Sequence, residues 1–143
     1  MKTLIQCLLL SFLVTACAVP EYSEHIQSTQ LIKTTTSWNG QPLPAYPDGT
    51  PEITILRITI PPKGLVPLHL HPVINAGVLL KGKLSVTTEA GDELHLEPNE
   101  PIVEVVNTWH YGKNEGDTPA EILVFYAGKV GTPVTITQSP EKP

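Results

Sequence analysis

The chain has 143 residues, of which 41% are hydrophobic and 16% charged, and its formal net charge is −5 at pH 7. This length suits one domain with a sizeable buried core. An acidic chain without a run of Lys or Arg is a poor partner for a phosphate backbone, so nucleic-acid binding is excluded as the expected function.

The first 16 residues have the pattern of an export signal. Lys2 precedes an apolar or small-polar run over residues 4–14, which is too short to span a bilayer. Val14-Thr15-Ala16-Cys17 resembles the bacterial lipobox, in which the cysteine is acylated and becomes the new N-terminus. The sequence therefore predicts a periplasmic or cell-envelope lipoprotein, anchored to the membrane by lipidation of Cys17. Cleavage by ordinary signal peptidase, giving a soluble periplasmic or secreted protein, fits Ala16-Cys17-Ala18 as well.

Two segments precede the expected strands. Residues 17–30 are polar and lack periodicity, which is typical of a flexible tether. Residues 38–51 are rich in Pro and Gly, which predicts an ordered loop over the fold, with Trp38 and Tyr46 either closing a pocket or packing on the surface. We expect one domain over residues 31–143.

From residue 53 onward, short β-branched segments alternate with Gly, Pro, Asn or Asp about every ten residues. This spacing is typical of an all-β sandwich or barrel. No stretch has a sustained period of 3.6 residues, so we expect little or no helix. The expected strands are residues 53–60, 67–71, 77–80, 84–88, 93–97, 102–106, 110–113, 121–127 and 134–137.

Three histidines stand out within these strands. His69 and His71 are two residues apart, so their side chains should share one face of a strand. His110 begins another strand about forty residues later, and a barrel can bring the two segments together. Three neutral imidazoles suit Zn, Fe, Ni, Cu or Mn. The alternative is that the three are buried polar groups without an ion, whereas His95 is expected to face solvent.

The residues around these histidines resemble the two motifs of the cupin superfamily. The first motif has a glycine, His-x-His, a glutamate and a second glycine, and the corresponding residues here are Gly64, His69, His71, Asn75 and Gly82. Asn75 thus stands where the motif has its glutamate, and one residue is missing after Gly64.

The second motif ends in a histidine, three residues and an asparagine, which are His110 and Asn114 here. Its Gly-Asp turn is replaced by Asn99-Glu100, and Val105 and Asn107 replace its proline and glycine. The resemblance covers residues 53–127. It implies a small single-domain cupin, with a cupin-type double-sheet jelly-roll β-barrel.

The resemblance also implies a divalent transition metal ion held by His69, His71 and His110, with Asn75 at the place of the carboxylate. An asparagine oxygen is neutral and a poorer donor, so metal affinity should fall and Lewis acidity rise. Glu104 could supply the missing carboxylate, either by binding the metal directly or by contacting a residue that binds it. Period-2 alternation fits a solvent-facing Glu104 equally well. A further alternative is that no metal binds and the histidines contact a polar ligand.

For function, the resemblance implies that the exported domain binds or transforms a small organic molecule. As an enzyme it would be a metal-dependent oxygenase, isomerase or decarboxylase, although no catalytic residue can be assigned. The alternatives are a non-catalytic ligand- or metal-binding module at the membrane surface and a structural protein. A homodimer through residues 31–37 is also expected from the resemblance. The apolar residues expected to form either barrel core or pocket wall are Val73, Ile74, Val78, Leu80, Val106, Trp109, Phe125 and Tyr126.

Overall fold

The computed structural model describes residues 26–138, which form strands and no helix, as the sequence pattern predicts. The signal segment, Cys17 and most of the tether lie outside the described residues. Within the described part, no helix is long and apolar enough to cross a membrane. The strands are β1 (Pro51–Ile60), β2 (Leu65–Leu70), β3 (Ile74–Lys81), β4 (Leu84–Thr88), β5 (Glu93–Leu96), β6 (Pro101–Val103), β7 (His110–Asn114), β8 (Ala120–Lys129) and β9 (Ile136–Thr137).

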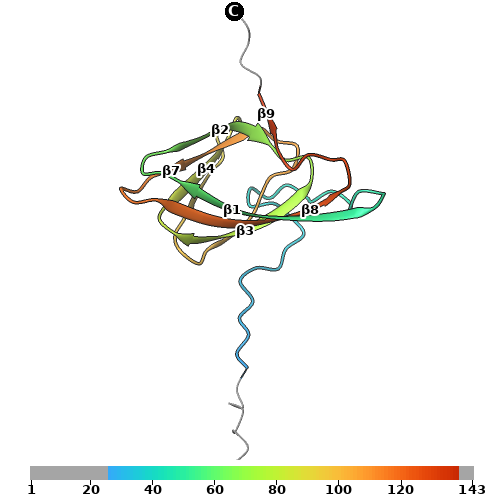
Figure 1. The fold of residues 1–143 in the computed structure, drawn as a ribbon, viewed down its shortest axis with the longest axis horizontal. Coiled ribbons are helices and arrows are strands. Elements are labelled where there is room, and N and C mark those ends of the chain that lie inside the picture. Colours follow the sequence, from blue (N-terminus) through green and yellow to red (C-terminus); the bar gives the residue numbers. More distant parts are fainter. Residues whose placement is uncertain (1–25, 139–143) are drawn as a thin grey trace, which may run out of the picture.

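The strands build two sheets that face each other, which confirms the expected all-β jelly roll (Figure 1). One sheet has the order β1-β8-β3-β6, and the other has the order β5-β4-β7-β2-β9. All strand pairs are antiparallel, and β1 pairs with β8 along its full length. β1 and β9 are each an edge strand of their sheet.

Side-chain alternation puts the core between the two sheets. On β8, Ile122, Val124 and Tyr126 are buried, whereas Phe125 between them is 45% exposed. The inward positions of β3 follow the same period, and Leu79 is fully buried. This pattern corrects the expected pocket wall, because Phe125 and Leu80 lie on the outer surface.

The strand that was expected over residues 102–106 ends at Val103. Beyond it, the Glu104 N–H donates to the Asn75 carbonyl at 3.2 Å, while the Glu104 carbonyl accepts from Ser37 Oγ at 2.9 Å. Val106 forms only an isolated parallel bridge with His71. The regular strand therefore ends at Val103, although the Glu104 N–H still pairs with β3 and only the Glu104 carbonyl turns to Ser37.

The proline-rich loop covers an edge of the fold rather than the cavity mouth. The Trp38 N–H donates to the Val103 carbonyl at 2.8 Å, and the indole packs against the core. Tyr46 is 76% exposed and does not line the main cavity. Neither aromatic lines the main cavity: Trp38 packs against the core, and Tyr46 lies on the surface. The expected homodimer stays a prediction.

Asn114, the last residue of the second motif, has a structural role. Its side chain is fully buried, and Nδ2 lies 2.8–3.1 Å from the carbonyls of Ile60, Pro61 and Thr118. Its Oδ1 accepts the Gly116 N–H at 2.9 Å. One amide thus joins the turn after β1 to the turn after β7.

We expect Asn114→Ala to lower the free energy of unfolding by about 3 kcal/mol, because several buried backbone groups would lose their partner. Urea denaturation measures the loss. Asn39→Ala is the control, since the Asn39 amide donates only to the exposed Asp92 carboxylate, and its midpoint should change little. Equal midpoints for the two variants would contradict this role.

Candidate metal centre

The structure brings the three predicted histidines together inside the fold. His69 lies on β2, His71 follows that strand directly, and His110 begins β7, with Cα pairing between His69 and His110. Their ring centroids are 4.4–5.1 Å apart. All three side chains are buried, with 9%, 2% and 1% exposure respectively. The predicted sharing of one face by His69 and His71 is therefore confirmed.

Backbone carbonyls fix the orientation of each ring. The Nδ1 atoms of His69 and His110 lie 2.7 and 2.8 Å from the carbonyls of Pro67 and Thr108, each two residues earlier in the chain. The Nδ1 of His71 lies 2.7 Å from the Val134 carbonyl. Because a carbonyl only accepts, each Nδ1 must carry the hydrogen and donate it. In the neutral rings, all three Nε2 lone pairs are then free for a metal.

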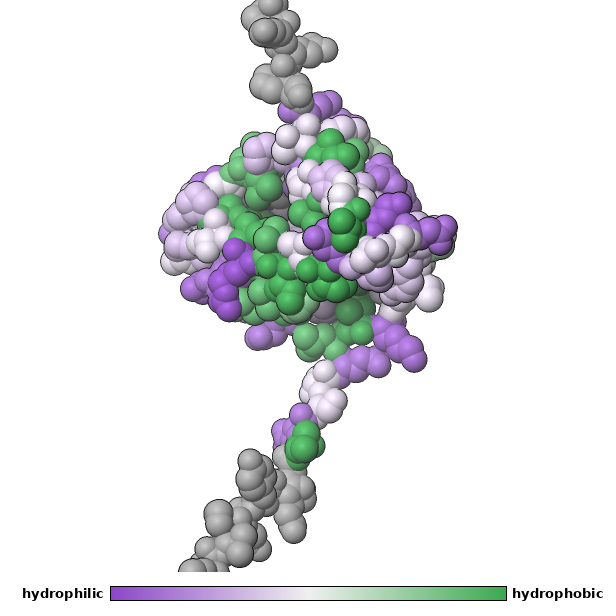
Figure 2. Space-filling view, turned by 45° about the vertical axis from the view of Figure 1, so that its right-hand side comes forward, coloured by the Kyte–Doolittle hydropathy of each residue, from purple (hydrophilic) through white to green (hydrophobic). Residues whose placement is uncertain are grey.

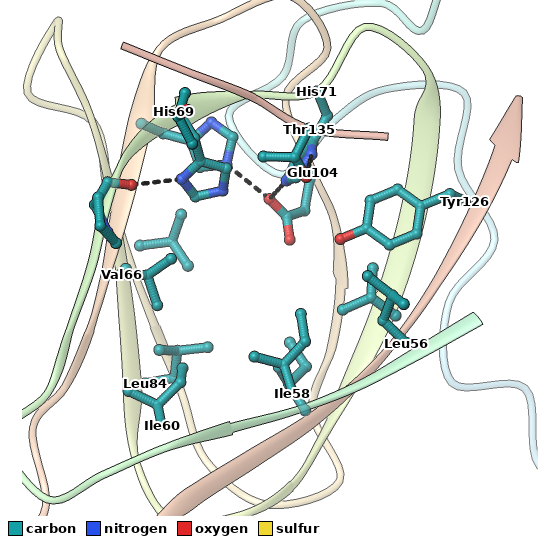
Figure 3. Close-up of a pocket in the computed structure, with 17 residues that line it drawn as sticks. Leu56, Ile58, Ile60, Val66, His69, His71, Leu84, Glu104, Tyr126 and Thr135 are labelled. Atoms are coloured by element: carbon teal, nitrogen blue, oxygen red, sulfur yellow. Dashed lines mark hydrogen bonds and ion pairs between the residues drawn. The ribbon is translucent and has the colours of Figure 1, made fainter. Parts of the chain in front are cut away.

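Glu104 is the carboxylate beside this cluster. Its Oε2 lies 2.9 Å from His110 Nε2 and 3.5 Å from His71 Nε2 (Figure 3). The residue is 8% exposed, which excludes the solvent-facing position, one of the two alternatives that the sequence left open for it. The Glu104 N–H bond to the Asn75 carbonyl explains this placement, because it makes residues 75 and 104 cross-strand neighbours on β3 and the segment after β6.

Asn75 also points inward, with 1% exposure, but it does not line the cavity. Its Oδ1 has no hydrogen-bond partner among the described residues, and its Nδ2 lies 3.5 Å from the Val73 carbonyl. A role for Asn75 as a ligand therefore stays a prediction. His95 is remote from the site, and its side chain is 69% exposed on β5, as its sequence context indicates.

Burial and charge set the protonation of the cluster. Burial, opposed by smaller contacts, lowers the pKa of His69 to about 4, so its ring is neutral at pH 7. For Glu104, burial alone would raise the pKa, but the close contacts and charges of His110 and His71 outweigh it and hold the pKa below its ordinary value. For His110, burial opposes protonation, yet Glu104 raises the pKa above its ordinary value. The Glu104 carboxylate is therefore charged at neutral pH.

These residues fit a metal ion. His69, His71 and His110 form a group whose candidate ligand atoms all lie within 4.8 Å of one another. Buried His110 Nε2 has no aligned hydrogen bond although Glu104 Oε2 lies 2.9 Å away. Two atoms that bind the same ion lie about 3 Å apart, because each of them is roughly 2.0–2.2 Å from the ion. Three imidazoles and a carboxylate also match the ligand preference of first-row divalent ions.

A cavity of 180 Å³ extends from this cluster into the fold. Figure 3 shows the histidines and Glu104 at one end and aliphatic side chains such as Ile58, Ile60 and Leu84 at the other. Leu56 on β1 and Thr137 on β9 line the cavity and are both exposed, so they mark its opening between the free edges of the two sheets. Figure 2 shows apolar residues gathered across one face of the molecule.

Sequence reasoning missed part of this site. Tyr126 was expected only as general core or pocket wall, but its hydroxyl points into the cavity and its ring lies 5.3 Å from that of His71 (Figure 3). Burial and the nearby Glu104 charge raise the pKa of Tyr126 to about 12, which keeps the phenol protonated. Thr135 Oγ1 lies 3.3 Å from His71 Nδ1. Alternation along β8 could have identified Tyr126, but no local signal marks Thr135.

Comparison with known proteins identifies the class of this domain. Residues 56–126 match the family model described as Cupin domain. Together with the two-sheet fold, this match supports a cupin-type jelly roll for the domain. Among curated proteins, none matches the sequence significantly.

Several solved structures share the fold. A recombinant oxalate oxidase in complex with glycolate is 22% identical, with a TM-score of 0.52 over 59% of this chain and 45% of that chain. The DMSP lyase from Ruegeria pomeroyi is 20% identical, with a TM-score of 0.54 over 73% of this chain and 49% of that chain. A protein with a double-stranded β-helix domain from Klebsiella pneumoniae is 14% identical, with a TM-score of 0.53 over 68% and 87%. The match spans about half the length of the two enzymes, and at these identities it shows the fold alone.

Proposed function

We propose that this chain is an exported metal-dependent cupin that binds or transforms a small organic molecule. The observation that carries the proposal is the convergence of three buried imidazoles, each with Nδ1 held by a backbone carbonyl and Nε2 turned to a common centre. In this proposal His69, His71 and His110 hold a divalent transition metal ion and Glu104 supplies the carboxylate. Its negative charge partly cancels that of the ion, which Asn75 could not do.

Such an ion would polarise a substrate oxygen or bind dioxygen, and the protein would hold the reacting groups in position and exclude water from them. Backbone carbonyls hold the imidazoles still, so little reorganisation is needed on binding. The aliphatic walls keep bulk water from the cluster, which strengthens the electrostatic interactions there. Tyr126, protonated and directed into the cavity, can donate a hydrogen bond to an anionic or carbonyl oxygen of the substrate.

Metal uptake and removal test the proposal. Protein purified without chelator, or reconstituted with Mn, Fe, Co, Ni, Cu or Zn, should hold about one ion per chain. Because the ion binds the folded state only, an ion concentration 100 times Kd stabilises it by about 2.7 kcal/mol. Chelation should therefore lower Tm by on the order of 10 °C. Absence of both stoichiometric metal and any change in Tm would contradict the proposal.

We also propose that acylated Cys17 anchors the domain to the membrane of the cell envelope. The support is the lipobox-like sequence before Cys17. In bacterial cells expressing the full chain, the protein should sediment with membranes, and Cys17→Ala should release it into the soluble periplasmic fraction. Identical distribution of the two proteins would contradict lipidation and favour ordinary signal cleavage.

A further inference from the structure

The cavity has two chemically different ends. Besides the three histidines, its polar lining comes from Glu104, Tyr126, Thr135 and Thr137. Away from this end, the walls are aliphatic and come from both sheets, for example Ile58 and Ile122 on one sheet and Val66 and Leu84 on the other. A ligand that fills the cavity must therefore place polar atoms at one end and hydrocarbon at the other.

The charges in the lining limit the ligand further. No Lys or Arg is among the residues that line this cavity, and Glu104 is its one carboxylate. A compact dianion can chelate the ion through both carboxylates, but together with Glu104 it would leave the buried site with one excess negative charge on a divalent ion, and no Lys or Arg in the lining offsets it. An unpaired buried charge is strongly unfavourable, so a compact dianion such as oxalate fits poorly.

The volume sets the size of the hydrocarbon part. An engineered cavity of about 150 Å³ lined by Leu, Ile and Phe binds benzene. At 180 Å³, the cavity here can hold a body about the size of a benzene ring together with a small head group. The opening at Leu56 and Thr137 gives such a molecule a route from solvent.

We propose that the ligand is a compact amphiphile with a single oxygen-donor head group, a carboxylate or phenol oxygen, on an aromatic or branched aliphatic body. The head group lies at the metal and Tyr126, and the body contacts the aliphatic walls. This inference rests on the metal site proposed above, and it deepens that proposal by naming the substrate class. It also separates this chain from the oxalate-binding cupins that share its fold.

Calorimetric titration and Tm measurement of the metal-loaded protein test the inference, with benzoate, phenol and 3-methylbutanoate as probes and oxalate as the contrasting dianion. Oxalate removes metals from proteins, so metal content is measured after each titration. We expect at least one amphiphile to bind the metal-loaded protein and raise its Tm. Its affinity should be at least 10-fold higher than that of oxalate for the same site. Metal-free protein should bind the same amphiphile more weakly, because the head group then loses its partner.

Two isoleucines on β1 provide matched variants. Ile58 lines the cavity, whereas Ile55 is 54% exposed and does not line it. Ile58→Ala should enlarge the cavity and shift preference from benzoate toward the larger 4-methylbenzoate, while Ile55→Ala should leave the ratio of the two affinities unchanged. The ratio is compared within each variant, so a general loss of stability does not imitate the effect.

The outcomes are distinguishable. If metal binds but no amphiphile does, or oxalate binds the loaded site as tightly, this inference is overturned and the metal site stands. An unchanged ratio in Ile58→Ala would likewise overturn the assignment of the aliphatic end. If the protein takes up no metal, the proposed function and this inference fail together.

Discussion

His110→Ala is expected to reduce metal affinity by more than about 100-fold. Loss of a residue that only orients a metal ligand typically lowers metal affinity 10–100-fold, so removal of a ligand itself should lower it further. His110 also lies nearest to Glu104, with 2.9 Å between Nε2 and Oε2, so the variant would also remove the polar side chain closest to that buried carboxylate. Titration with the metal that the wild type prefers, followed by metal analysis after gel filtration, measures the change.

His95→Ala is the matched control for this variant. It removes one imidazole from an exposed position on β5, remote from the cluster, and should retain full metal content. Circular dichroism of both variants verifies that the fold is kept. Wild-type affinity in a folded His110→Ala protein would show that this ring is not a ligand.

The second large effect is expected from Glu104→Gln, which should lower metal affinity by about 10–100-fold while keeping the shape of the side chain. The carboxylate brings the only negative charge among the residues that line the cavity. Its loss leaves three neutral imidazoles facing the full charge of the ion. Competition with a metal-binding dye measures the difference, and Glu93→Gln, an exposed carboxylate on β5, serves as control.

The cross-strand position of Asn75 gives a stronger form of this test. Because the Glu104 N–H bonds the Asn75 carbonyl, the two positions are neighbours, and Asn75 points inward. A carboxylate placed at residue 75 should reach the same ion. Asn75→Glu combined with Glu104→Gln should therefore recover at least half of the lost binding free energy. If Glu104→Gln alone binds metal like the wild type, the carboxylate has no role in the site.

The fold could be predicted from the sequence because its signals are local. Alternation and turn residues at intervals of about ten positions indicate strands regardless of how the strands later pair. The His69 and His71 pair was equally accessible, since two residues of separation in a strand put both side chains on one face. The third histidine, His110, was a weaker prediction, because nothing local relates residue 110 to residue 69; it depended on a barrel bringing the two strands together and on the resemblance.

Glu104 is a residue whose side-chain direction could not be predicted from the local sequence pattern. Val103, Glu104 and Val105 are all buried, so alternation along this segment does not tell which face the Glu104 side chain takes. The face follows from the bond of the Glu104 N–H to Asn75 on β3, whose side chain points inward. The direction of its side chain thus depends on long-range contacts. The same holds for Val134 and Thr135, which approach His71 only because β9 pairs with β2.

The account is tested most directly by a crystal structure of the metal-loaded protein with anomalous data collected on both sides of the metal's absorption edge. It predicts one peak within about 2.0–2.2 Å of Nε2 of His69, His71 and His110, with a Glu104 carboxylate oxygen completing the protein ligands. A fully loaded crystal with no peak at this cluster, or with its ion bound elsewhere on the chain, would contradict it.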